Sequence, residues 1–562
     1  MVQLTFSAAR PEPPVLYARE ELTRYLTRML AGATAAIEVE LDVQPPPHPA
    51  PGWDAALDDW FHVQARPGRI AVTGSNARSV LLGAYRLLHH LGCRFLMPGR
   101  RHEAVPALRP EDLRADLQEA AACRHRGVCI EGADSLENIL DFIDWLPKIG
   151  CNSFFVQHLE PEAFLQNWYA HKYNPLLAPA PRSEAELQRM YRQIDAAIAR
   201  RGLLHHRAGH GWTCKAIGFE HVCAKLPAPT GAQRPLLAEV DGRREFWQGV
   251  PSNTNLCYSN PAARRAFVQS VADYAGAHPE VDYLHVWLAD EYNNICECDA
   301  CRRTTLSDQY VGLLNEIDAE LTRRGLGTRI AFLLYQELLW PPEHAVLEHP
   351  ERFTLMFAPI SRTFERSYAD HGALPPLPAF RRNRIRLPET VEENLAFLRA
   401  WQERCRVDAF VYDYPLGRAH YGDLGYCAIA RVIAQDIGAL PELGLNGYCS
   451  CQELRAALPN AWPNYVMGRM LWDRTLDPQA LQEEYFTALY GAGAAEARDA
   501  LERLITSTAS APGRTRRWPH GSAGRRTPPK RCGHWPPKNR HFAPICTKLP
   551  GNCLTITPDT VD

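Results

Sequence analysis

Residues 282–291 read DYLHVWLADE, a mostly apolar segment that delivers two adjacent carboxylates, Asp290 and Glu291. A short apolar run of this kind is typical of a strand in a parallel sheet, where both faces of the strand are covered. We therefore predict a buried strand that places both acids at one end of a sheet.

The same arrangement repeats along residues 124–455, where short apolar runs alternate with amphipathic helical stretches. This alternation is the pattern of repeated βα units. The predicted strands are Arg126–Ile130, Ser153–His158, Leu203–Ala208, Tyr283–Leu288, Ile330–Tyr335, Thr354–Ala358, Ala409–Tyr412 and Gly447–Cys451. The predicted helices between them include Glu137–Lys148, Glu184–Arg200, Ala262–Ala277, Tyr310–Arg323, Val391–Arg404 and Ala428–Leu440. Eight such units predict a (β/α)8 TIM barrel.

A doubly wound open sheet is the alternative with a similar order of elements. No glycine-rich phosphate turn follows the first predicted strand, so the nucleotide-binding version of that fold has little support.

The α/β fold predicted for the whole chain has three structured parts. A small α/β domain occupies residues 1–120, the (β/α)8 catalytic barrel residues 121–455, and a helical cap residues 456–510. The small domain is predicted from Tyr17–Leu30, Arg69–Gly74 and Ser79–Leu91, and the cap from Asn464–Trp472 and Pro478–Tyr490.

Residues 511–562 differ from the rest of the chain. They contain ten Lys or Arg against two Asp, abundant proline and no amphipathic period, which predicts disorder. One interpretation is a frameshift that replaced a native helical end, because the helix beginning near Ala494 stops without a completed pattern. A basic nucleic-acid-binding tail is the rival interpretation.

The composition is that of a globular protein, with 46% hydrophobic and 22% charged residues in 562. A net charge of −2 argues against nucleic acid or an anionic membrane as a partner. The chain shows neither an apolar run long enough to cross a membrane nor a signal peptide, so we expect a cytoplasmic protein. The 17 cysteines lack framework spacings and favour reduced thiols. No pattern defines an oligomeric state.

Polar and aromatic residues stand at the ends of the predicted strands. Because active sites of (β/α)8 barrels lie at the carboxyl ends of the strands, these residues are the functional candidates. The carboxylates are Asp290, Glu291, Glu337, Asp413 and Glu453; the substrate-binding candidates are Glu131, Gln157, His158, His210, Trp212, Trp287, Tyr335, Arg362, Tyr412 and Tyr414.

Carboxylates, aromatic rings and a histidine on one face are the groups that sugar chemistry requires. One carboxylic acid protonates the leaving oxygen, and a second carboxylate or an amide on the sugar supports the oxocarbenium-like centre. Proximity of like charges and partial burial at Asp290 and Glu291 would raise the pKa of one of them, which produces a general acid. For each aromatic residue alone, packing in the core is an equally good interpretation.

A cluster of thiols, Cys296, Cys298 and Cys301, follows directly. Three thiolates this close suit a structural Zn²⁺, whose fourth ligand would be Cys257 or a histidine. Reduced thiols that support the loop are the alternative. The chemistry itself requires no cofactor.

These motifs resemble the domain-of-unknown-function family numbered 4838, over residues 10–505. The matching segments are Arg124-His125-Arg126-Gly127, residues 145–152, Asp290-Glu291 with the following thiols, and Leu471-Trp472-Asp473. The first domain resembles the small N-terminal domain of α-glucuronidases and hexosaminidases. The resemblance implies a glycoside-hydrolase-like barrel.

More distantly, the acid pair resembles that of family 20 β-hexosaminidases. This resemblance implies that Glu291 is the general acid and that Asp290 orients the substrate's acetamido group as an internal nucleophile. His210-Gly211 stands where those enzymes carry a Gly-His element, whereas Leu288-Ala289 replaces their Gly-Gly. An α-glucuronidase-like scheme also stays open, with Glu337, Asp413 or Glu453 as base or nucleophile.

The function predicted from the sequence is therefore a glycosidase that acts on an O-glycosidic bond of a carbohydrate substrate. Two alternatives from other classes are a carbohydrate-binding protein without activity and a metal-dependent hydrolase.

Overall fold

The computed structural model of the protein describes residues 2–509 except residues 9, 132–133, 158, 160, 172–173, 175, 220–223, 418 and 454–458. Residues 1–510 form one unit by their internal contacts. The predicted substrate residue His158 and the basic segment 511–562 lie outside the described residues. No helix among the described residues is both long and apolar enough to span a bilayer.

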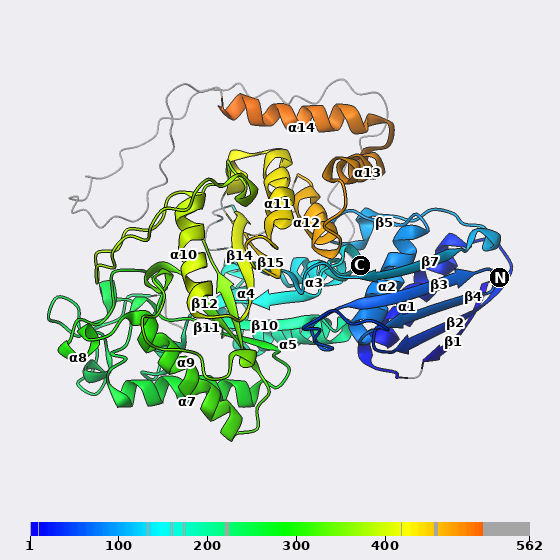
Figure 1. Cartoon of the computed structure of the whole chain (residues 1–562). Coiled ribbons are helices and arrows are strands. Elements are labelled where there is room, and N and C mark those ends of the chain that lie inside the picture. Colours follow the sequence, from blue (N-terminus) through cyan, green and yellow to red (C-terminus); the bar gives the residue numbers. More distant parts are fainter. Residues whose placement is uncertain are drawn as a thin grey trace. The chain divides into compact units, whose positions relative to one another are not determined.

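Eight parallel strands close into a barrel (Figure 1), which confirms the predicted fold. In chain order they are β8 (His125–Ile130), β9 (Ser153–Val156), β10 (Leu204–Gly209), β11 (Tyr283–Val286), β12 (Arg329–Leu334), β13 (Phe353–Phe357), β14 (Asp408–Leu416) and β15 (Gly447–Gln452). Each strand pairs with the next, and β15 pairs with β8 to complete the ring. The largest departure from the predicted bounds is in β14, which continues to Leu416 past an irregularity in its pairing with β15.

Helices cover the outside of the barrel. They are α3 (Leu136–Trp145), α5 (Glu184–Arg201), α7 (Pro261–Ala277), α9 (Leu306–Arg323), α10 (Val391–Arg404), α11 (Cys427–Ala439) and α12 (Trp462–Trp472). The connection from β12 to β13 differs, because residues 335–352, all of them described, contain only the 3₁₀ helices η7 (Gln336–Leu339) and η8 (Pro350–Arg352). After α12 come α13 (Pro478–Tyr490) and α14 (Ala494–Ala509), in agreement with the predicted helical segment.

The interior of the barrel is filled by mostly apolar side chains, as in other barrels of this type. They include Cys129, Phe155, Trp287, Leu333, Met356, Phe410, Tyr412 and Cys451. Deeper in the barrel, the rings of His206 and His285 lie with Nδ1 of the first 3.0 Å from Nε2 of the second. Burial lowers the pKa of both histidines, so they are neutral components of the core.

The N-terminal residues form a separate five-stranded sheet with two helices. Its strands are β1 (Val2–Ala8), β2 (Ala35–Val43), β3 (Trp60–Arg66), β4 (Arg69–Gly74) and β7 (Ala115–Ala120), in the order β1-β2-β4-β3-β7, and its helices are α1 (Pro13–Met29) and α2 (Ala77–His90). The sequence pattern identified only β4 among these strands. Strands β1 (VQLTFSA) and β2 (AAIEVELDV) alternate apolar and polar residues, as strands with one covered face do, so this signal was present in the sequence and was missed.

A buried ionic network joins this sheet to the barrel. The Asp59 carboxylate accepts hydrogen bonds from Arg78 of α2 and Arg126 of β8, and the Arg126 distance is 2.6 Å. Burial alone would raise the pKa of Asp59, but the two guanidinium groups hold it at about 2. Asp59 is therefore ionised and paired, as a buried charge must be.

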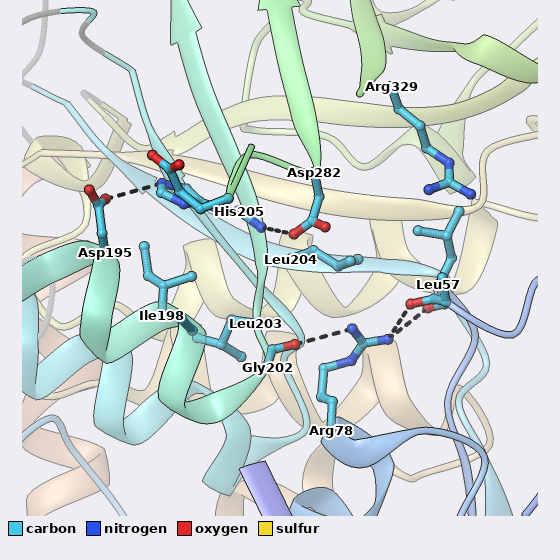
Figure 2. A pocket seen from close by; sticks show the side chains of 13 residues that line it. Leu57, Arg78, Asp195, Ile198, Gly202, Leu203, Leu204, His205, Asp282 and Arg329 are labelled. Atoms are coloured by element: carbon cyan, nitrogen blue, oxygen red, sulfur yellow. Dashed lines mark hydrogen bonds and ion pairs between the residues drawn. The ribbon is translucent and has the colours of Figure 1, made fainter. Parts of the chain in front are cut away.

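A cavity of about 300 Å³ lies at the amino-terminal ends of β10, β11 and β12. Figure 2 shows Arg78 of α2 reaching toward the backbone of Gly202 and Leu57, with Asp282 bound to the backbone N–H of His205. This is the end of the barrel that normally serves stability, and its polar groups bind one another. We therefore assign it a structural role.

Candidate active site

Non-glycine residues with positive φ gather at the carboxyl ends of three adjacent strands. Ala208 in β10 has φ 74°, Glu291 and Asn293 after β11 have 66° and 61°, and Gln336 after β12 has 53°. This left-handed conformation costs roughly 1–2 kcal/mol for a residue with a Cβ. Because such strain concentrates at functional sites, it directs attention to residues 289–295, which we call the acidic loop.

Asp290 lies opposite His210, which follows β10. Nε2 of His210 is 3.8 Å from Oδ1 of Asp290, and Nδ1 is 2.9 Å from the carbonyl oxygen of Leu288. Because a carbonyl only accepts hydrogen bonds, Nδ1 carries a proton and Nε2 faces the carboxylate. The Asp290 side chain is 50% exposed, so it can meet a ligand from outside.

Glu291 is half-buried beside Asp290, whose Oδ1 accepts the backbone N–H of Glu291 at 2.9 Å. Burial, and then the neighbouring Asp290 carboxylate, raise the pKa of Glu291 above its ordinary value. A glutamic acid that keeps its proton to higher pH is suited to general acid catalysis.

Glu337 follows β12 and is 4% exposed. Its Oε1 accepts the backbone N–H of Asn293, which ties η7 to the acidic loop. Burial raises the pKa of Glu337 to about 7. A cavity of about 20 Å³, enough for one water molecule, is lined by His210, Asn255, Tyr335 and Glu337 together with apolar residues.

The aromatic candidates divide into two groups. Trp287 and Tyr412 are 3% and 1% exposed, and their ring centroids are 6.1 Å apart inside the barrel. Tyr335 and Tyr414 are only half-buried, and Tyr414 packs edge-on against Tyr412 at 5.3 Å. Tyr335 and Tyr414 can therefore contact a substrate, whereas Trp287 and Tyr412 form the floor beneath them.

A second polar group lies at the ends of β8, β9 and β15. The exposed carboxylate of Glu131 accepts from the thiol of Cys451 at 3.0 Å and from Nε2 of Gln157 at 3.5 Å. Since β9 pairs with β10, which leads to His210, these groups share the same end of the barrel. Glu453 follows β15 and is half-buried, with its backbone N–H bonded to Leu416.

The structure corrects the predicted roles of Arg362, which follows β13, and of Asp413 in β14. Asp413 and Arg362 have fully buried side chains and form an ion pair of 2.8 Å, which also includes Asp436. Alternate residues of a strand face opposite sides, so Asp413 points away from the side of Tyr412 and Tyr414. Asp413 is thus not available as a base, nor Arg362 as a ligand for hydroxyls.

Trp212 is also placed differently from the prediction. It is fully buried in α6 (Trp212–Lys215), donates from Nε1 to the carbonyl oxygen of His285 at 2.9 Å and packs edge-on against Tyr274 of α7. Strand-end position alone could not show that this ring turns into the barrel wall.

Three asparagines that the sequence analysis missed hold the acidic loop. Nδ2 of Asn255 donates to Asn294 at 2.8 Å, and Nδ2 of Asn294 donates to the carbonyl oxygen of Asp290 at 3.0 Å. Oδ1 of Asn255 accepts the backbone N–H of Ala289, and Asn293 supplies the N–H bound by Glu337. The pair Asn293-Asn294, separated from the two acids by one residue, was a visible signal in the sequence.

Cys257, Cys296, Cys298 and Cys301 come together beside this loop, with all four sulfur atoms within 4.8 Å of one another. The structure thus places Cys257, one of the two kinds of residue suggested as the fourth ligand, together with the three predicted thiols.

Residues 232–502 match the family described as "Domain of unknown function (DUF4838)", which confirms the predicted resemblance over slightly less than half of the chain. The match includes the acid pair and the four cysteines, whereas the segments 124–127 and 145–152 lie before it. No curated protein matches the chain.

Solved structures of glycoside hydrolases are similar to the chain at low sequence identity. A GH138 enzyme targeting pectin rhamnogalacturonan II is 10% identical with a TM-score of 0.51, over 90% of this chain and 55% of that one. The chain therefore spans about half the length of that enzyme. The Streptomyces plicatus N-acetyl-β-hexosaminidase is 14% identical with a TM-score of 0.45, over 89% of this chain and 91% of that one. A GH89 enzyme from Clostridium perfringens is 11% identical with a TM-score of 0.49, over 85% of this chain and 51% of that one.

Proposed function

We propose that the protein is a glycoside hydrolase that cleaves an O-glycosidic bond with Glu291 as the general acid. The observation that carries this proposal is the gathering of Asp290, Glu291 and Glu337 at the ends of two adjacent barrel strands, with raised pKa values at Glu291 and Glu337. Carboxyl groups that differ in protonation are what acid-assisted glycoside cleavage requires.

In the proposed reaction, Glu291 donates its proton to the oxygen of the departing group as the glycosidic bond breaks. Asp290 is the orienting or stabilising partner, and His210, 3.8 Å away, limits the directions that its carboxylate can take. Because Asp290 is adjacent in sequence and half-exposed, it can reach a group on the sugar next to the breaking bond.

Glu337 is assigned a supporting role. Its carboxyl group is buried and its pKa is about 7, so a large fraction of it is neutral near neutral pH and is a poor nucleophile. Its bond to the Asn293 backbone instead fixes the position of the acidic loop. Glu453 is the remaining predicted carboxylate for a base or nucleophile in the α-glucuronidase-like scheme.

The substrate is proposed to be a sugar that stacks on Tyr335 or Tyr414. Half-buried tyrosines offer an apolar ring to sugar C–H groups and a hydroxyl for hydrogen bonds. The resemblance of the acid pair to that of family 20 β-hexosaminidases favours a 2-acetamido sugar, and the resemblance of the first domain to α-glucuronidases makes uronic acids the second class to try.

The experiment is hydrolysis of a panel of aryl glycosides that includes N-acetylhexosaminides and glucuronides. Wild type is compared with Glu291→Gln and with Glu343→Gln, which makes the same change at an exposed glutamate after β12. We expect one class of sugar to be cleaved, with a loss of at least about 10²-fold in Glu291→Gln only. If folded wild type binds sugars without cleaving any, the carbohydrate-binding alternative replaces this proposal.

A further inference from the structure

Four cysteines from two separate segments meet beside the acidic loop and form what we call the thiol cluster. Its members are Cys257, before α7, and Cys296, Cys298 and Cys301, after β11. No disulfide joins them, since all four are free. Their sulfur atoms instead face one another as a group.

The spacing of the sulfur atoms matches a tetrahedral metal site. The Sγ atom of Cys257 lies 3.7 Å from that of Cys298 and 3.8 Å from that of Cys301. Four sulfurs at the usual Zn–S length of about 2.3 Å stand about 3.8 Å apart at the corners of a regular tetrahedron. Disulfide sulfurs would be about 2.05 Å apart.

The surroundings supply the outer groups that thiolate ligands need. The backbone N–H of Glu239 donates to Sγ of Cys296 at 3.3 Å, and the hydroxyl of Ser259 lies 3.1 Å from Sγ of Cys301. In the thiolate form of Cys301, that hydroxyl becomes the donor. Both contacts lower the energy of a negatively charged sulfur.

Two arginines balance the charge. A divalent ion with four thiolates carries a net charge of −2, and Arg244 contacts the thiols of Cys257 and Cys298. Arg382 donates to the carbonyl oxygens of Cys296 at 2.8 Å and Cys301 at 2.9 Å. Arg244 also pairs with Glu239 at 3.3 Å, and Arg382 also donates to the carbonyl oxygen of Thr304. Both guanidinium groups thus lie where they can offset part of the charge of four thiolates.

We propose that the thiol cluster is a structural Zn²⁺ site with four cysteine ligands. On binding, Zn²⁺ displaces four thiol protons and forms four Zn–S bonds, with no change of oxidation state. All four positions are protein ligands, so the ion has no open position for a substrate and is not catalytic.

The site joins the segment before α7 to the acidic loop. Cys257 lies two residues from Asn255, and Cys296 lies two residues from Asn294, the pair that holds Ala289 and Asp290. Zinc would therefore fix the two segments whose asparagines hold the acidic loop. This role supports the site, and the ion takes no part in the reaction.

The first experiment is elemental analysis of the full chain, purified under reducing conditions without a polyhistidine tag. We expect one zinc per chain, retained against a competing chelator in wild type and in Cys405→Ser, which changes a half-buried thiol outside the cluster. Cys257→Ser and Cys298→Ser should lose the metal to the same chelator. Zinc held equally tightly by Cys257→Ser, or iron in place of zinc, would overturn the proposal.

A second measurement uses wild type alone, in case the variants fail to fold. A mercurial that binds thiols should release one equivalent of zinc to a metallochromic dye, and replacement by Co²⁺ should give sulfur-to-metal charge-transfer absorption. Removal of zinc should lower the midpoint of thermal unfolding, and its return should restore it. Wild type that takes up no metal after reduction and incubation with zinc contradicts the proposal.

Discussion

Oε1 of Glu337 accepts the backbone N–H of Asn293, two residues beyond Glu291. A carboxyl group at the end of β12 thus holds the loop at the end of β11. The bond links Glu337 to the loop that carries Glu291. Ionisation of the buried Glu337 therefore affects both the stability of the fold and the acidic loop.

Glu337 should make the stability of the protein depend on pH. Its pKa rises from 4.5 to about 7 on folding, so the folded protein keeps a proton that the unfolded chain releases between these values. The free energy of unfolding should fall across this window, by about 3 kcal/mol in total. Glu337→Gln removes the titration but keeps an oxygen for the Asn293 N–H.

The measurement is denaturant unfolding of both proteins at pH 4.5 and pH 8. Relative to wild type, Glu337→Gln should gain stability at the higher pH, and all other titrating groups cancel in the comparison. An equal difference at both pH values would show that Glu337 is not buried as an acid.

The positive φ of Glu291 should appear as stored strain. Glycine adopts φ 66° without a Cβ penalty, so Glu291→Gly should be more stable than Glu291→Gln by about 1 kcal/mol, although both lack the carboxyl group. At Asp290, whose φ is not positive, glycine should instead be less stable than asparagine. Thermal unfolding of the four variants measures both differences in stability. If glycine is more stable than the amide at both positions, or at neither, Glu291 is not strained.

Asp413 should matter for folding and not for catalysis. Asp413→Ala leaves the buried Arg362 with only Asp436 as its carboxylate partner, and we expect a loss of about 3 kcal/mol in the free energy of unfolding. The kcat of the folded fraction should stay close to that of wild type. A fully stable variant without activity would return Asp413 to the list of catalytic candidates.

Much of the fold was predictable because each barrel strand is a buried apolar run between amphipathic helices. The same runs predicted which residues stand at strand ends, but not which way those residues face. Asp413 differs from its neighbours Tyr412 and Tyr414 only by the alternation of the strand, and Trp212 lies beyond the strand in a short helix. Asn293 and Asn294 stand close to the acids in the sequence, but the part of Asn255 could not be predicted, because its bonds to Ala289 and Asn294 join segments more than 30 residues apart.

The central claim is that Glu291 donates a proton to the departing group, and its most direct test is the dependence of rate on that group. Wild type and Glu291→Gln are compared on aryl glycosides of one sugar whose leaving groups range from strongly to weakly acidic phenols. The account predicts a loss of about 10²-fold or more for weakly acidic phenols and a small loss for strongly acidic ones, which need no proton to leave. An equal loss for every leaving group, or no loss, would contradict it.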